Sequence, residues 1–100
     1  MSWVKNEAGF RDFLSLVIVH APDEFPEEDF LEPEEQLTLD MAFKELHIGV
    51  NLLSAKRVTE AKRNELRSIL QKAHSKYFEG RDVEAAHLLQ ELEAIAFKSA

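Results

Sequence analysis

Apolar side chains in the stretch 34–56 follow two separate helical stripes. At about 100° per residue, one stripe consists of Leu39, Ala42, Phe43, Leu46, Val50 and Leu53. The second stripe consists of Leu37, Met41, Ile48, Leu52 and Ala55. A helix on the surface of a domain needs only one such stripe. The stretch therefore predicts a helix that is covered on two sides, either by its own chain or by another one.

Polar residues divide these two stripes unequally. A broad polar edge consists of Asp40, Lys44, His47, Asn51 and Ser54. On the other side, the stripes are separated only by Thr38, Glu45, Gly49 and Lys56. We expect the second stripe to form a homodimer interface through Leu37, Met41, Ile48 and Leu52. The alternative is that the aromatic first helix of the same chain covers it.

Three further stretches have the apolar spacing of helices, namely 3–20, 59–78 and 82–98. Within the first, the run Leu16–Val19 is apolar nearly all round, which suits either a deeply buried helix or a short strand. We predict a helix, because no other stretch offers a strand to pair with it. Ala21-Pro22 ends this helix. Gly80 followed by Asp82 predicts a tight turn, with Asp82 as the N-cap of the last helix.

Together these elements predict an all-α fold, a four-helix antiparallel bundle-like domain that spans residues 1–100. Residues 21–33 form the predicted linker between the first two helices, because all three prolines of the chain lie there. Short connections at the other two joints favour antiparallel neighbours. With 45% hydrophobic residues, the chain of 100 residues can bury one core.

Charge is concentrated in the linker and the start of the next helix. The segment 23–35, called the acidic segment below, contains no base and eight acids: Asp23, Glu24, Glu27, Glu28, Asp29, Glu32, Glu34 and Glu35. The other 87 residues contain 12 bases and 11 acids. The net charge of −7 therefore comes from one short segment. Phe25, Phe30 and Leu31 interrupt its acids and could contact the core or a partner.

The composition excludes several classes of protein. The chain has no cysteine, so disulfides, thiolate zinc sites and cysteine nucleophiles are absent. Its longest apolar run, Leu16–Val19, is far shorter than a membrane span, and the first ten residues lack the apolar region of a signal peptide. From these features we predict a soluble cytoplasmic protein without a membrane partner.

Known catalytic and cofactor motifs give no support for an enzyme. The sequence has no glycine-rich phosphate loop, nucleophile elbow or pair of buried carboxylates. Its histidines, which form no His-x-x-x-His pair, map to helix ends or polar edges: His20, His47, His74 and His87. We therefore expect no metal, no cofactor and no catalytic residues.

One motif points to a different class of function. The heptapeptide from Arg81 to His87 resembles the motif of HEPN-type ribonucleases, an arginine followed five to seven positions later by a histidine in an all-α bundle. The resemblance implies a dimer in which Arg81 counters the phosphate charge and His87 transfers protons. Arg67 and His74 satisfy a looser version of the same pattern. Dense negative charge opposes RNA binding, so we expect no nucleic-acid partner.

The acidic segment favours a protein-binding module. Negative charge speeds the encounter with a basic partner, and apolar residues within the segment can then anchor it. In size and charge the chain resembles immunity proteins and antitoxins, which neutralise an effector protein. The predicted partner-binding residues are Asp23, Glu24, Phe25, Glu27, Glu28, Asp29, Phe30, Leu31 and Glu32. The alternatives are a segment that serves only solubility, and the ribonuclease dimer.

Overall fold

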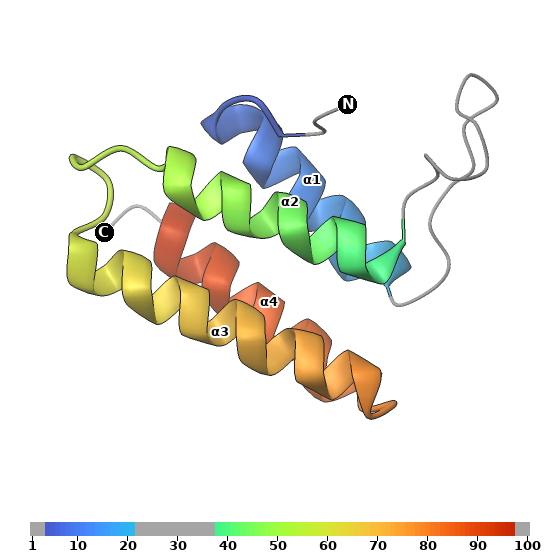
Figure 1. Cartoon of the computed structure of the whole chain (residues 1–100). Helices are drawn as coiled ribbons and strands as arrows, with labels where there is room; N and C mark the ends of the chain where they lie inside the picture. The colour runs from blue at the N-terminus through green and yellow to red at the C-terminus, as the bar shows by residue number, and fades with distance from the viewer. Residues whose placement is uncertain (1–3, 22–37, 98–100) are drawn as a thin grey trace, which may run out of the picture.

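The computed structural model describes residues 4–21 and 38–97. They form four helices: α1 (Glu7–His20), α2 (Leu39–Leu52), α3 (Glu60–Phe78) and α4 (Asp82–Phe97). Consecutive helices run in opposite directions (Figure 1). Each packs against two others, since α1 contacts α2 and α4, and α3 contacts the same two helices. The predicted all-α antiparallel bundle is confirmed, and the described residues contain no strand.

Three helices begin at a side chain that caps their free backbone N–H groups. The Asn6 side chain accepts a hydrogen bond from Gly9 N at 2.7 Å, Thr38 from Met41 N at 3.3 Å, and Thr59 from Lys62 N at 3.1 Å. An oxygen at this position satisfies one of the donors that the first turn leaves unpaired. The sequence therefore fixes where α1, α2 and α3 start.

Gly80 produces the tight turn between α3 and α4. Its φ angle of 81° lies in the left-handed region, which a side chain would disfavour. Gly80 N donates to Tyr77 O, and Arg81 N donates to Lys76 O, as in a Schellman motif. The helix α4 begins at Asp82 itself, so Asp82 lies in the first turn and not at the N-cap. There its charge still complements the helix dipole.

The helix α2 is shorter at its end than the predicted stretch 34–56. It ends at Leu52, because Leu53 adopts an extended conformation with ψ 133°. Arg63 of α3 donates hydrogen bonds to Val50 O and Leu53 O, so two carbonyls of the helix end have a partner. Residues 34–37 lie outside the described residues.

The helix α1 packs against the narrow polar side of α2, which contains Glu45 and Gly49. Gly49 lies under the Phe10 ring, and a Cβ built on Gly49 would be 2.1 Å from Phe10 Cδ1. Glu45 is also buried there and accepts a hydrogen bond from Val4 N at 3.0 Å. The first stripe of α2 faces the core. The second stripe lies beside the contact with α1, where Met41 and Ile48 are half-buried and Leu52 is exposed.

The core is built from all four helices, and aromatic rings pack against one another between α2 and α3. Phe43 of α2 stacks on the His74 imidazole at 4.5 Å and meets Tyr77 edge-on at 5.9 Å. The run Leu16–Val19 is helical as predicted, but it is not buried all round, because Val19 is 69% exposed on the outer side of α1. Within the described ranges, none of the helices combines the length and apolar character needed to cross a membrane.

Candidate functional site

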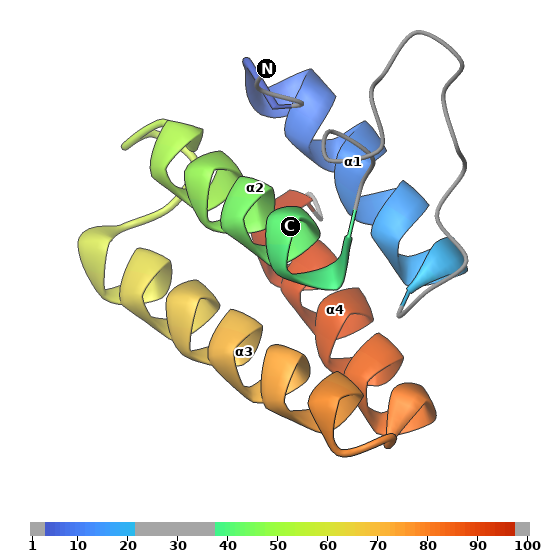
Figure 2. The same ribbon diagram turned by 45° about the vertical axis from the view of Figure 1, so that its right-hand side comes forward.

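Both attachment points of the acidic segment lie at one end of the bundle. Ala21 follows the end of α1 and Thr38 precedes the start of α2, and these two helix ends lie together (Figure 1). The turn between α3 and α4 lies at the same end (Figure 2). We call this the linker end. The predicted partner-binding residues 23–32 themselves fall outside the described residues.

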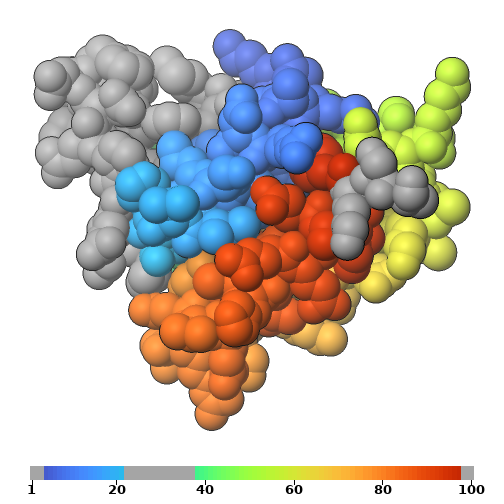
Figure 3. Space-filling view, turned by 180° about the vertical axis from the view of Figure 1, so that it is seen from behind, coloured from blue at the N-terminus to red at the C-terminus, as the bar shows by residue number. Residues whose placement is uncertain are grey.

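Exposed large apolar side chains also concentrate at the linker end. Among the described residues, Val19, Phe78 and Val83 are 69%, 87% and 69% exposed, and all three lie there. Leu52, which is 40% exposed, lies at the opposite end. From behind, α1 and α4 pack side by side and the α3–α4 turn projects beyond them (Figure 3). The linker end therefore combines apolar surface with the attachment of the acidic segment.

The described residues have no net charge, since they contain 11 bases and 11 acids. Most bases of α3 have partners within the bundle. Lys62 pairs with Glu65 and Lys76 with Glu84, whereas Arg63 and Arg67 share Glu60. Among the five bases of α3, only Lys72 makes no ion pair with a described residue. Their positive charge is thus largely compensated locally.

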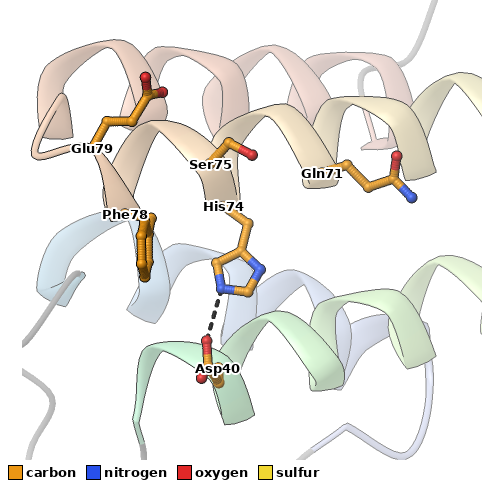
Figure 4. Close-up of a pocket in the computed structure, with 6 residues that line it drawn as sticks. All are labelled: Asp40, Gln71, His74, Ser75, Phe78 and Glu79. Carbon is orange, nitrogen blue, oxygen red and sulfur yellow. Dashed lines mark hydrogen bonds and ion pairs between the residues drawn. The ribbon is translucent and has the colours of Figure 1, made fainter.

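A shallow groove of about 730 Å³ separates the end of α3 from the start of α2. Its lining residues are Asp40, Gln71, His74, Ser75, Phe78 and Glu79. His74 Nε2 lies 2.9 Å from Asp40 Oδ1 (Figure 4). The imidazole is held in place, because its ring stacks on buried Phe43 with an interplanar angle of 6°. We call this feature the Phe78 groove.

Side chains of the Phe78 groove point in two directions. Phe78 and His74 extend from α3 toward the start of α2, where Asp40 lies, whereas Glu79 extends the other way (Figure 4). The Asp40 side chain is 88% exposed, and its Oδ2 atom has no hydrogen-bond partner among the described residues. The apolar spacing of α3 does not predict this groove, although Phe78 lies outside the buried face of the helix and is a signal for exposed apolar surface.

His47 lies further along the same α2–α3 junction, half-buried. Burial lowers the pKa of His47 below its ordinary value of 6.5, and the charges of His74 and Arg67 lower it further. Arg67 is fixed beside it by a hydrogen bond of 2.6 Å to Asn51 Oδ1. The folded protein therefore favours the neutral imidazole of His47.

We expect this histidine to make stability depend on pH. The unfolded chain binds the proton more tightly, so the contribution of His47 is complete above pH 6.5 and is lost as the pH falls toward its folded pKa. Urea unfolding at about pH 7.5 and about pH 5.5 measures the loss. His47→Gln should reduce the difference between the two pH values. An unchanged difference would contradict the assignment.

Arg81 and His87, the two residues of the ribonuclease motif, make no contact with each other in the structure. Arg81 lies at the α3–α4 turn, where its Nη1 is 3.7 Å from Glu84 Oε2. His87 is exposed on α4, and no interaction connects it to Arg81. The looser pair, Arg67 and His74, lies on one side of α3 and faces α2, but Arg67 is engaged by Asn51 and Glu60, among others.

The predicted dimer residues occupy a half-exposed margin of α2. Met41 packs partly against the core, Ile48 is half-buried, and Leu52 is 40% exposed. Leu37 lies outside the described residues. For metals, the described part of the chain contains no group of three or more histidine, aspartate or glutamate side chains that could hold an ion.

Comparison with protein-family models, with curated proteins and with solved structures finds no match to this chain.

Proposed function

We propose that this protein is a small acidic protein-binding module whose residues 23–32 bind a basic surface on another protein. One observation carries the proposal, namely the segregation of charge. The described residues hold equal numbers of acids and bases, whereas the acidic segment holds eight acids and no base. A solubilising charge could be spread over the whole surface. A concentrated charge instead steers a basic partner to one place.

The linker end supplies the apolar component that a stable interface needs. Phe78 is the last residue of α3 and Val83 lies in the first turn of α4, and both side chains are exposed. The turn that joins these helices lies at the same end of the bundle as the helix ends to which the acidic segment attaches (Figure 2). An interface of this kind gains specificity from charge and affinity from a few desolvated anchors. Neutralisation of a basic effector, as by an immunity protein or antitoxin, is the form of binding that we propose. The cytoplasm remains the expected compartment.

Two observations favour a protein partner over RNA. Most bases of α3 already have carboxylate partners, so little positive charge is free to bind phosphates. Arg81 also pairs with Glu84, which would compete with a phosphate for its guanidinium. We therefore propose a binding protein and not an enzyme.

The proposal also includes a homodimer through the second stripe of α2. Its support is the margin of half-exposed apolar side chains formed by Met41, Ile48 and Leu52. Interfaces between identical subunits are more apolar than other protein interfaces. Light scattering of the purified protein measures the mass directly, and a monomer mass would remove this part of the proposal.

Charge reversal in the acidic segment is the test of function. The triple replacement Glu27→Lys, Glu28→Lys and Asp29→Lys is expected to weaken binding to the natural partner by about tenfold or more. The partner is first captured from a lysate of the source cells at low salt and identified by mass spectrometry. Binding is then measured with the purified partner, which the proposal requires to be basic and released by salt.

A matched triple replacement elsewhere controls for net charge. Asp12→Lys, Glu65→Lys and Glu91→Lys change exposed acids on three helices and raise the net charge from −7 by the same six units. This control should keep most of the binding. Equal losses in the two triple variants would mean that only overall charge matters, and the proposal of a recognition segment would be wrong.

A further inference from the structure

Phe78 is the most exposed large apolar side chain among the described residues, at 87%. It is also the last residue of α3, where the helix dipole favours a positive charge. Asp40, whose side chain is 88% exposed, lies across the groove. An aromatic ring and a carboxylate on opposite sides of a small hollow match the two ways in which proteins bind a cation, over a ring and against an acid.

The lining of the Phe78 groove contains two acidic residues and neither lysine nor arginine. Asp40 lies opposite His74, whereas Glu79 extends away from it (Figure 4). Three other grooves on the described surface each contain at least one basic side chain, namely Lys56 and Arg57, Lys72 and Lys76, or Arg11. The Phe78 groove is thus the one of these four that a cationic side chain could enter without meeting a like charge on its wall.

Another phenylalanine of this chain, Phe97, makes cation–π contacts with arginine, which Phe78 does not make with any described residue. At the opposite end of the bundle, the guanidinium groups of Arg11 and Arg57 lie 5.7 and 5.4 Å from the ring centroid of Phe97. These distances are within the range of cation–π contacts. No cation lies over the Phe78 ring among the described residues. Phe97 thus already has arginine side chains over its ring, whereas the ring of Phe78 carries none from the described part of the chain and is free to receive one.

We propose that the Phe78 groove binds an arginine side chain of the basic partner, with the guanidinium over the Phe78 ring and paired with the Asp40 carboxylate. His74 positions Asp40 through Oδ1 and leaves Oδ2 for the ligand. This inference rests on the proposed function, because that function supplies a basic partner. It adds a second contact, on the helices themselves, to the contact made by the acidic segment.

Arginine should be preferred to lysine at this groove. A guanidinium is planar, so it can lie flat on an aromatic ring while its N–H groups pair with a carboxylate. It is also less strongly hydrated than an ammonium group. A lysine could satisfy the carboxylate, but its compact charge would not stack on Phe78. A preference for arginine over lysine would therefore show that the Phe78 ring takes part in binding. Equal binding would show only electrostatic attraction to the carboxylates.

Nuclear magnetic resonance titration of the full-length protein tests the proposal. The probe is Nα-acetyl-L-arginine amide, and the matched neutral probe is Nα-acetyl-L-citrulline amide. With the arginine probe we expect saturable shifts of the Ser75 and His74 backbone amides, with a Kd of about 1 to 10 mM, since only one cation–π contact and one ion pair form. The citrulline probe and the corresponding lysine probe, Nα-acetyl-L-lysine amide, should each bind at least about fivefold more weakly.

Two single replacements identify the residues that bind the probe. Phe78→Ser should weaken arginine binding about fivefold, and Asp40→Asn about threefold. Val83→Ser is the control, because Val83 is also exposed at the linker end but does not line the groove. Arginine binding unchanged by Phe78→Ser, or weakened equally by Val83→Ser, would overturn the proposal. So would equal affinity for arginine and citrulline.

The same variants separate this inference from the proposed function. If Phe78→Ser leaves partner binding intact while the triple reversal of Glu27, Glu28 and Asp29 removes it, the acidic segment binds and the groove proposal fails. If Phe78→Ser weakens both probe and partner while the triple reversal has no effect, the groove stands and the segment proposal fails. Probe binding in the triple variant should remain within about twofold of the native value, because the groove is unchanged.

Discussion

Gly49→Ala is expected to lower the free energy of unfolding by about 2 to 3 kcal/mol, although alanine is the better helix former by about 1 kcal/mol. The added Cβ would lie 2.1 Å from Cδ1 and 2.7 Å from Cε1 of Phe10. Phe10 is completely buried and cannot swing aside. The helix α1 must then move away from α2, which opens the core on that side.

Urea unfolding followed by circular dichroism measures this change, and a fall in Tm of about 10 °C should accompany it. Gly9→Ala is the control, because its Cβ would meet only the end of the Asn6 side chain at 3.3 Å. That variant should lose no more than about 0.5 kcal/mol. In a Phe10→Leu background, Gly49→Ala should cost about 1 kcal/mol less than in the native protein, whereas strictly additive effects would contradict the proposed contact.

Arg63→Met is expected to cost about 2 to 3 kcal/mol, because it removes charged donors from a nearly buried position. The Arg63 side chain is only 11% exposed. Its Nη2 donates to Leu53 O at 2.8 Å, its Nη1 donates to Val50 O, and its Nε pairs with Glu60 at 3.4 Å. Methionine can fill the space of the aliphatic stem, but it leaves Leu53 O without its donor and leaves Val50 O with only the backbone N–H of Leu53.

The neighbouring residue provides a matched control for this experiment. Lys62→Met removes one positive charge from the same turn of α3, but the Lys62–Glu65 pair is about half exposed on both sides. Its loss should change the unfolding free energy by less than about 0.5 kcal/mol. Arg63→Lys should be intermediate, because one ammonium group does not reproduce the geometry of two guanidinium donors. Equal effects of Arg63→Met and Lys62→Met would contradict the role of Arg63 as a cap.

Several local features follow directly from the residues that produce them. Asn6, Thr38 and Thr59 can accept hydrogen bonds from the first turns that follow, and Gly80 can adopt a positive φ, so helix limits near these positions were predictable. The charge of the acidic segment is equally a property of the sequence. No contact between distant residues is needed for either.

The prediction for the stretch 34–56 shows where sequence reasoning stops. Its period indicated a helix covered on two sides, and α2 is such a helix. The residues treated as a mere separator, Glu45 and Gly49, are in fact where α1 packs. A period records which residues share a side of a helix. It does not record how close the neighbouring helix comes, which depends on the absence of a Cβ at Gly49.

The candidate site divides in the same way. By itself, the sequence determined the helical stretches and the concentration of negative charge, because each depends on neighbours within a few positions along the chain. Only the tertiary structure decided that Asp40 and His74, 34 positions apart, meet beside an exposed Phe78. It also decided that exposed apolar residues gather at the linker end. Both depend on how antiparallel helices are aligned, which packing of the core sets.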